Sequence, residues 1–563
     1  MNAFLKEFFA TTGTPRRAVL LLALAGIVSG AANAALLAIV GETLRHDLAW
    51  QPARAAGWFV GAGVLFLVLQ RYSLARSARL TEEATARIRL SVIDAAFEAS
   101  LADSERIDHH RKRLILSRDA AQVASALPNI VALLSSLATV LGALGYLFWL
   151  SPVSGAVVCV VIALAVATFQ VLLGRTTRRL RAAYAENDRS FGFVDDLLHG
   201  HKELKLDAVW AREFVDHDLV PSVERASTLL GDVRSAQQDI GLIGVVAFLV
   251  LLGAATFLSP LLGFSTPVMV NALLVLLFIQ AHIHGIVLRL PGLVEMRHSA
   301  SRIRQLMGDL RPRSDVAGVG STEGPLSVSD TWRQLRLCDI GYSYVGQAAT
   351  GGFQLRDVDL TIARGQTVFI VGGNGSGKTT LAKILVGLYT PTHGEMHLGD
   401  TAITEPNRAQ YRQLFNAVFS DVHLFRRRMG GVLTDLGSEV HHALAEMSIR
   451  LVVSDDQRLD VKPFSQGQKK RLASALALAS DKPLCLFDEW TADQDPEFRA
   501  YFHTRYLPAL KAAGKTLLVI SHDDQYFHHA DLIVRMDGGR VASVAPPQPA
   551  IAGCTVHSLP VGA

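Results

Sequence analysis

Charged residues are scarce in this chain of 563 residues. Asp, Glu, Lys and Arg make up 19% of it and half of all residues are apolar, whereas soluble domains carry about 25% charge. The net charge of +4, from 55 basic and 51 acidic residues, gives no electrostatic basis for nucleic acid as a partner. This composition excludes a disordered chain and predicts either a membrane protein or an unusually apolar soluble one.

Cysteine is scarce as well. The four cysteines lie far apart in the sequence, at Cys159, Cys338, Cys485 and Cys554. No two of them form a C-x-x-C pair, and no His/Cys cluster has the spacing of metal ligands. The sequence therefore predicts neither a disulfide framework nor a structural zinc site.

Long apolar runs are present instead. Crossing a bilayer as a helix takes about 20 mostly apolar residues, and six stretches meet or approach that length: about 18–41, 55–72, 126–150, 152–174, 240–258 and 267–290. Lys and Arg are concentrated at the N-terminus, in the two long connections and after the sixth stretch. The positive-inside rule then predicts a multi-pass protein of the cell inner membrane, with both termini and both long connections cytoplasmic.

The two long connections are rich in Ala, Leu, Arg and Glu over 80–101 and 176–198, which predicts helices that continue beyond the membrane. Charge runs near their tips, at 108–112 and 200–205, form either solvated faces or docking elements for a soluble domain. In the sixth stretch, Gln280 and His284 lie four residues apart and share one helix face. They either line a substrate path or form hydrogen bonds between helices.

The composition changes to Gly, Ser, Pro and charge over 302–330, which marks a linker. The residues from 331 to 545 then alternate between strand and helix patterns, and 546–563 form a tail. A strand-type run at 367–371 opens into a G-x-x-x-x-G-K-[ST] motif, formed by Gly372, Gly373, Asn374, Gly375, Ser376, Gly377, Lys378, Thr379 and Thr380. Its backbone N–H groups suit phosphate oxygens, Lys378 is expected to reach the β- and γ-phosphates, and the Thr379 hydroxyl is expected to bind a Mg²⁺ ion. The motif therefore predicts that ATP or a related nucleotide binds here.

Acidic residues and a histidine follow two further apolar strands. Asp488 and Glu489 end the run at 483–487, and His522 follows the run at 516–520. The end of a strand in an open α/β sheet is where ligands gather. Asp488 is therefore a candidate Mg²⁺ ligand, while Glu489 and His522 are candidate catalytic residues, Glu489 to polarise the attacking water and His522 to face the γ-phosphate.

The string F-S-Q-G-Q at 464–468, some twenty residues before Asp488, resembles the L-S-G-G-Q signature of ABC-transporter ATPases. Six spans ahead of one ATPase domain resemble an exporter half-transporter. The resemblance implies an all-α six-helix transmembrane domain over 1–301, followed by an α/β P-loop NTPase domain over 331–545. It also implies that two copies sandwich two ATP molecules. The resemblance also implies roles for further residues. Tyr344 would stack on the adenine and Asp495 would belong to the D-loop. The partner's ATP would be contacted by the signature residues Ser465, Gln466, Gly467 and Gln468.

Three positions depart from the family pattern. Ser420, in V-F-S-D, stands where the family has a glutamine that reaches Mg²⁺, so Ser420 or Asp421 is a further candidate near the metal. Gln466 replaces the first glycine of the signature and crowds a tight loop. Trp490 replaces the proline that usually follows the catalytic glutamate. Because Glu489 and His522 are both present, hydrolysis is expected to be retained.

The strings around these departures, F-S-Q-G-Q-K-K-R-L-A and L-F-D-E-W-T-A-D-Q-D-P-E-F-R, resemble an exporter subfamily for cyclic peptides and peptide siderophores, which includes pyoverdine-precursor and syringomycin exporters. The resemblance implies ATP-driven export of such a peptide by a homodimer, with the docked tips moving as the ATPase domains close. Two alternatives remain at this point: an exporter of lipids or hydrophobic drugs, and an ATP-dependent membrane regulator that moves nothing.

Overall fold

The computed structural model describes residue 9 and residues 12–45, 52–257, 266–310, 332–344, 352–425, 438–450, 464–478 and 482–547. The chain falls into two compact units. The helical unit comprises Met1–Glu98 and Ile107–Leu310, and the sheet unit comprises Ala99–Arg106 and Arg311–Ala563. Nearly all of the predicted tail and most of the predicted linker lie outside the described residues.

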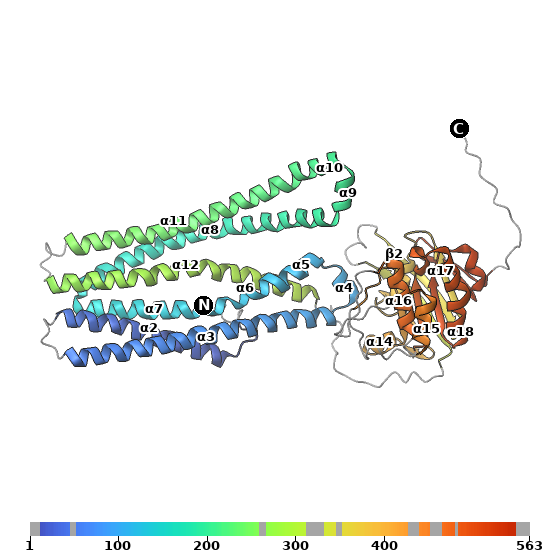
Figure 1. The fold of residues 1–563 in the computed structure, drawn as a ribbon, viewed down its shortest axis with the longest axis horizontal. Coiled ribbons are helices and arrows are strands. Elements are labelled where there is room, and N and C mark those ends of the chain that lie inside the picture. Colours follow the sequence, from blue (N-terminus) through green and yellow to red (C-terminus); the bar gives the residue numbers. More distant parts are fainter. Residues whose placement is uncertain are drawn as a thin grey trace. The chain divides into compact units, whose positions relative to one another are not determined.

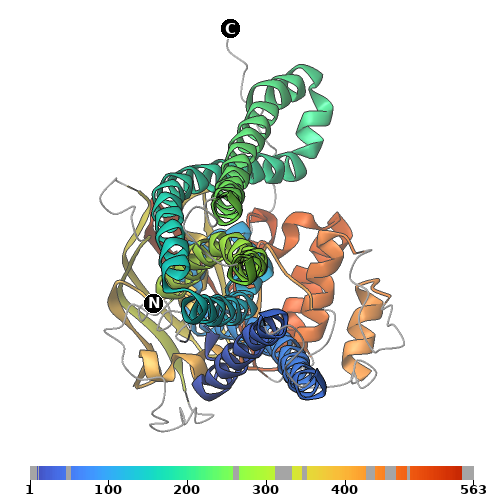
Figure 2. The ribbon, with the colours of Figure 1, turned by 90° about the vertical axis from the view of Figure 1, so that its left-hand side faces the viewer.

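The helical unit is built from long helices that lie lengthwise beside one another (Figure 1, Figure 2). These are α2 (Arg16–Arg45), α3 (Pro52–Glu98), α7 (Ala126–Leu150), α8 (Pro152–His199), α11 (Val220–Phe257) and α12 (Thr266–Leu310). Short segments connect them: α5 (His109–Leu114), the π-helix η1 (Ile115–Asp119), α6 (Ala120–Ala124), α9 (His201–Leu206), α10 (Ala208–Glu213) and the π-helix η2 (Phe214–Leu219).

The helical character predicted for the long connections is confirmed, since α3 continues to Glu98 and α8 to His199. Helix α12 also continues further than the sequence suggested. Residues 302–310, predicted to open the linker, are helical. Ile303, Leu306 and Leu310 are buried there and lie three and four residues apart, so they form a short apolar stripe on one helix face. The overall composition of this segment did not indicate a helix, because charged residues and Gly308 lie between them.

The turn between α7 and α8 consists of Ser151 alone. Its backbone is extended, and its side chain accepts a hydrogen bond from the Ser154 N–H at 3.3 Å, which caps α8. Pro152 occupies the first helical position, where its missing N–H costs nothing. The result is a tight antiparallel pair of helices.

Four helices among the described residues are long and apolar enough to cross a membrane: Arg16–Leu44, Ala53–Glu98, His109–Leu150 and Val268–Leu310. Shorter apolar helices cover Pro152–Leu164 and Gly244–Phe257. Large apolar side chains are exposed along α3, for example Trp58 and Leu67. An apolar surface of this kind is stable only against an apolar phase such as lipid or another apolar surface.

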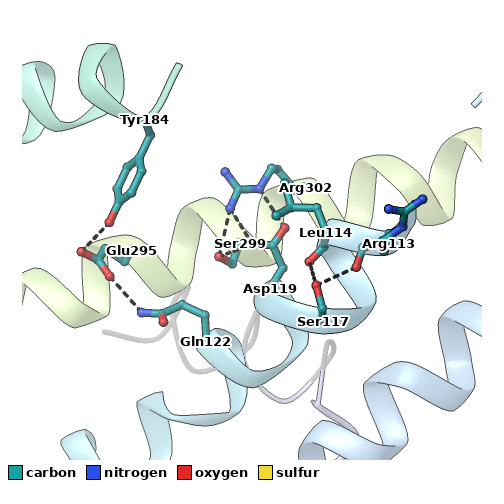
Figure 3. A network of polar contacts seen from close by, with 9 residues as sticks. All are labelled: Arg113, Leu114, Ser117, Asp119, Gln122, Tyr184, Glu295, Ser299 and Arg302. Atoms are coloured by element: carbon teal, nitrogen blue, oxygen red, sulfur yellow. Dashed lines mark hydrogen bonds and ion pairs between the residues drawn. The ribbon is translucent and has the colours of Figure 1, made fainter. Parts of the chain in front are cut away.

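Beyond the predicted spans, a network of polar side chains joins three helices of this unit (Figure 3). The Glu295 carboxylate on α12 accepts hydrogen bonds from the Tyr184 hydroxyl of α8 at 2.8 Å and from the Gln122 amide of α6 at 3.0 Å. Two turns further along α12, Arg302 forms an ion pair with the buried Asp119 of η1. These contacts fix the extensions of α6, α8 and α12 to one another.

The sheet unit contains a six-stranded sheet in the order β10-β9-β3-β8-β7-β6, parallel from β9 to β6, with β10 antiparallel. Its strands are β3 (Thr367–Gly372), β6 (Phe415–Val418), β7 (Leu484–Asp488), β8 (Thr516–Ile520), β9 (Leu532–Asp537) and β10 (Arg540–Ala545). A second, antiparallel sheet has the order β2-β1-β4-β5, formed by β1 (Gln334–Ser343), β2 (Gln354–Ala363), β4 (His393–Leu398) and β5 (Thr401–Ala402).

Helices complete this unit: α4 (Leu101–Glu105), α13 (Lys378–Leu385), α14 (Glu405–Arg412), α15 (Ser438–Glu446), α16 (Gln466–Leu478), the 3₁₀-helix η4 (Trp490–Asp493), α17 (Pro496–Tyr501), the π-helix η5 (Phe502–Tyr506), α18 (Leu507–Ala512) and the 3₁₀-helix η6 (Asp524–His529). Alternate residues of the central strands enter two cores, Val368 and Ile370 one and Phe369 and Val371 the other. Burial on both faces is why these strands read as continuous apolar runs.

Helix α4, although it follows α3 in the chain, belongs to the sheet unit. Leu101 and Ala102 pack against the core of that unit. The Glu105 carboxylate accepts a hydrogen bond from the Tyr389 hydroxyl and pairs with the Lys383 ammonium at 2.9 Å. The charge run at 108–112, for which the sequence left a solvated face and a docking element open, forms the N-cap and first turn of α5 in the helical unit. Docking uses the apolar residues just before it, whereas the charges lie on exposed or half-buried surface.

Candidate nucleotide site

Three neighbouring parallel strands bring the predicted motifs to one edge of the sheet. β8 lies between β3 and β7, with Ile520 in register with both Ile370 and Asp488. The phosphate-loop motif follows β3, His522 follows β8, and Glu489 follows β7. The predicted adjacency of these strand ends is therefore confirmed, and it is at such carboxyl ends that open α/β sheets bind ligands.

The phosphate-loop motif forms a compact turn before α13. Gly377 has a left-handed φ of 100°, and a Cβ at this position would lie 2.7 Å from the Phe353 ring, so glycine is required there. Lys378 is buried, and its ammonium donates hydrogen bonds to the carbonyls of Gly372 and Gly373 at 3.0 Å each. The Ser376 hydroxyl is buried without a hydrogen-bond partner among the described residues. A concave turn with a fixed cation and an unused hydroxyl suits a polyphosphate.

Asp488 is fully buried at the end of β7, and neither carboxylate oxygen has a hydrogen-bond partner within the described part of the chain. Burial raises the pKa of Asp488 to about 6, the Glu489 carboxylate adds to the rise, and the nearby Thr379 hydroxyl and Lys470 ammonium oppose it. A buried carboxyl with two unused oxygens is the donor that a hard divalent cation takes. The residues present therefore fit Mg²⁺.

Glu489 adopts a left-handed backbone conformation, with φ 49° and ψ 43°, which is rare for a residue other than glycine. Its N–H donates to the Ile520 carbonyl of β8 at 3.1 Å. Its carboxylate lies 3.5 Å from His522 Nε2. The two candidate catalytic side chains are thus close together, although they are 33 residues apart in sequence (522 − 489).

Tyr344 follows β1 and lies beside α13, with its hydroxyl 3.0 Å from the Thr380 hydroxyl. Its ring meets the edges of Tyr342 and Tyr389, at centroid distances of 5.2 and 6.1 Å. Ser420 and Asp421 are exposed in the turn after β6, the strand beside β7. The Asp421 charge contributes to the raised pKa of Asp488, so this turn lies close to the predicted metal ligand.

The signature string begins α16. Ser465 and Gln468 cap it reciprocally, since each backbone N–H donates to the other residue's side chain, at 2.9 and 3.2 Å. Gln466 is the first helical residue and is exposed, so the predicted crowding at this position does not occur. The glycine that matters is Gly467, because a Cβ there would lie 2.3 Å from the Asp493 carbonyl.

The D-loop packs directly on this helix start, since the Gln494 amide donates to the Gly467 carbonyl at 3.0 Å. Asp495, the predicted D-loop residue, is exposed and caps α17, with its carbonyl accepting from the Arg499 N–H. The resemblance places Gln494 in the D-loop string without a contact of its own, and the sequence did not single out Lys470 of α16, whose buried side chain reaches the Glu489 carbonyl. A lysine inside a helix gives no signal of burial in the sequence.

In the sixth predicted span, His282 forms the hydrogen bond between helices. Its Nε2 lies 3.1 Å from the Asn33 amide of α2. Gln280 is half-buried and His284 is exposed. The His284 ring lies beside Gly241 of α11, since a Cβ added at Gly241 would be 3.8 Å from its Cε1 atom. The structure thus supplies the interhelical hydrogen bond through His282, a residue outside the predicted pair.

Known proteins resemble both units. The ABC transporter transmembrane region model matches residues 18–206, and the ABC transporter model matches residues 355–492. The chain is 29% identical to ATP-binding protein SyrD of Pseudomonas syringae pv. syringae, over 92% of this chain and 93% of SyrD. It is 26% identical to the ATP-dependent lipid A-core flippase of Paraburkholderia xenovorans, over 86% and 83%.

Over 204 residues the chain is 35% identical to the energy-coupling factor transporter ATP-binding protein EcfA of Onion yellows phytoplasma, which covers 34% of this chain and 74% of EcfA. The fold is similar to that of a bacterial Atm1-family ABC exporter solved with ATP bound, with a TM-score of 0.73 at 18% identity over 95% of this chain and 96% of that one. The chain therefore belongs to the ABC transporters, as a multi-pass exporter-type half-transporter whose ATPase domain couples ATP hydrolysis to transport.

Proposed function

We propose that this half-transporter exports a cyclic or nonribosomal peptide, or a peptide-siderophore precursor, from the cytoplasm across the inner membrane. The observation that carries the proposal is the similarity to SyrD across 92% of the chain, which includes the membrane domain where cargo binds. The ATPase strings that resemble the peptide-exporter subfamily support it. The similarity to the lipid A-core flippase, nearly as long, supports a lipid as the second candidate cargo.

For hydrolysis, we assign ATP to the loop from Gly372 to Thr380, with Lys378 against the β- and γ-phosphates and Tyr344 on the adenine. Thr379 and Asp488, with Ser420 or Asp421 nearby, would hold Mg²⁺, which when bound neutralises charge on the phosphates. Glu489 accepts a proton from the attacking water, and His522, 3.5 Å from its carboxylate, stabilises the γ-phosphate side of the site.

We propose that two copies act together. One chain carries one phosphate loop and one signature, so two copies facing each other complete two ATP sites with Ser465, Gln466, Gly467 and Gln468 of the partner. The tip of the α8–α11 hairpin supports this arrangement. Leu206 is 89% exposed, and Leu198, Val209 and Trp210 are also exposed. Apolar side chains at a cytoplasmic tip need a partner surface, and the sheet unit of the second copy provides one.

Alternating access follows from this assembly. ATP binding preferentially to the closed pair of sheet units supplies the free energy for closure, and α4 carries the movement to the helical unit within each chain. Both termini lie in the cytoplasm in this proposal, because the basic residues gather on that side. Gln280 and His284 are the proposed polar residues of the cargo path in α12.

The test is transport by the purified protein in proteoliposomes, with ATP supplied on the side of the outward-facing ATPase domains. Movement of cyclic or nonribosomal peptides into the lumen, with peptide-stimulated ATPase activity, is the expected result. Fluorescent lipid analogues test the second candidate in the same vesicles. Glu489→Gln, which we expect to bind ATP without hydrolysing it, serves as the matched control. Lipid movement without peptide movement would overturn the peptide assignment.

A further inference from the structure

Lys470 is a lysine whose side chain is only 1% exposed, on the face of α16 that meets the end of β7. Its ammonium donates a hydrogen bond to the backbone carbonyl of Glu489 at 2.8 Å. The same ammonium pairs with the Asp493 carboxylate at 2.6 Å. Burying a charge is costly unless it is paired and hydrogen-bonded, and these two contacts satisfy Lys470.

The Glu489 peptide group needs such a contact. Its left-handed φ of 49° is unfavourable for a residue with a Cβ, so surrounding contacts have to hold it. On one side its N–H is fixed by the Ile520 carbonyl of β8. On the other side its carbonyl accepts the shorter of its two hydrogen bonds from Lys470, at 2.8 Å, and the longer from the Ala492 N–H, at 3.3 Å. The direction of the Glu489 side chain, toward His522, follows from a backbone held at both ends.

The contact belongs to a row along α16. The Gly467 carbonyl accepts from Gln494, the Lys470 ammonium reaches Glu489, and the Ser474 hydroxyl accepts from the Trp490 indole N–H at 2.8 Å. Positions 467, 470 and 474 are three and four residues apart, so they lie on one face of the helix. The whole segment from 489 to 494 is therefore attached to the helix that starts with the signature.

We propose that Lys470 is a positioning residue for hydrolysis. It holds the Glu489 carbonyl so that the carboxylate stays directed at the nucleotide, and it makes this geometry depend on the placement of α16. Because the start of α16 faces the partner's ATP in the proposed dimer, engagement of that ATP is transmitted along the row to Glu489. The inference rests on the proposed role of Glu489 as the base.

The test is a comparison of Lys470→Met with Lys470→Arg in the full-length protein, in lipid nanodiscs without cargo. Steady-state ATPase assays give kcat and KM, and a fluorescent ATP analogue gives binding. For Lys470→Met we expect kcat to fall about 10- to 100-fold, which equals about 1.4–2.7 kcal/mol of activation free energy. KM and analogue binding should stay within about threefold. Lys470→Arg retains a cationic hydrogen-bond donor, so the fall in its log kcat should be at most two thirds of the fall seen in Lys470→Met.

Lys469→Met is the matched control, because it removes the same charge from the neighbouring position, for which no contact with Glu489 exists among the described residues. Its kcat should remain within about twofold of the unmodified protein. An unchanged kcat in Lys470→Met, or equal losses in Lys470→Met and Lys469→Met, would overturn the proposal. If Lys470→Met misfolds, it will fail to bind the fluorescent ATP analogue. The ATPase activity of Lys470→Arg then tests the proposal instead. A Lys470→Arg that binds nucleotide but has no ATPase activity contradicts the positioning role.

The separate variant Glu489→Gln keeps this result distinct from the proposed function. If Glu489→Gln hydrolyses ATP normally, the base assignment fails, and Lys470 has nothing to position. If Glu489→Gln is inactive and Lys470→Met is fully active, only the inference about Lys470 fails. Neither outcome depends on the cargo, because no cargo is present in the assay.

Discussion

The ion pair between Asp119 and Arg302 holds η1 against α12, and its removal is the most direct test of how these helices are fixed to one another (Figure 3). Asp119 is fully buried and accepts hydrogen bonds from Arg302 Nε at 2.8 Å and from the Ser299 hydroxyl at 2.9 Å. The hydrogen bond to Asp119 is the main cause that raises the pKa of Arg302. Asp119→Ala leaves a half-buried guanidinium without its carboxylate.

Loss of one partner of a fully buried pair costs about 3–5 kcal/mol. Arg302 is 31% exposed, so water takes up part of the loss, and we expect about 2–3 kcal/mol. At about 2 °C per kcal/mol for a unit of this size, the unfolding midpoint should fall by about 4–6 °C. Thermal unfolding of the purified protein in one detergent, at a fixed scan rate, measures this shift.

The double variant Asp119→Leu with Arg302→Met is the matched control, since it replaces the pair with apolar side chains of similar volume. Such replacements are neutral or stabilising in many buried pairs, so the midpoint should lie within about 2 °C of the unmodified protein. An unchanged midpoint in Asp119→Ala would refute the reasoning. A double variant as unstable as the single one would show that packing, not the unpaired charge, causes the loss.

Three further predictions concern the sheet unit. Burial lowers the pKa of His503, so the unfolded state binds more protons than the folded state. The free energy of unfolding should therefore fall as the pH drops below the ordinary histidine pKa of about 6.5. In urea titrations at several pH values, His503→Phe should show a weaker pH dependence of this free energy. Gly467→Ala places a Cβ 2.3 Å from the Asp493 carbonyl, and ATPase assays should show at least a tenfold loss with ATP binding retained. Glu105→Gln removes the charge that Tyr389 and Lys383 contact, and cargo-stimulated ATPase should fall while basal ATPase stays within about twofold.

Local patterns were sufficient to predict the centre of the sheet unit. The runs before Lys378, Glu489 and His522 were read as strands, and they form β3, β7 and β8 side by side. This worked because parallel strands are buried on both faces and leave uninterrupted apolar runs. The phosphate-loop motif similarly depends on backbone geometry that only a few glycines permit, so its residues are readable in one chain.

Tertiary contacts were not readable in the same way. The docking of α4 relies on Leu101 and Ala102, two ordinary apolar residues, whereas the more conspicuous charges at 108–112 form part of another helix. Lys470 looks like a solvated helix residue in the sequence, yet it is buried because a carbonyl and a carboxylate from a distant turn meet it. The sequence around a charge run or a single lysine does not indicate which residues it will contact, so these contacts are known only from the fold.

The departure at Trp490 has a physical explanation in these contacts. A proline at position 490 would bias the preceding residue toward extended backbone, which is incompatible with the left-handed conformation of Glu489. Trp490 removes that restriction, stacks on Phe502 at 4.2 Å, and donates its indole N–H to Ser474. The turn after β7 is therefore held by side-chain contacts with α16. The conformation of Glu489 thus rests on a residue of α16, Lys470, and on its own neighbour in the chain, Trp490.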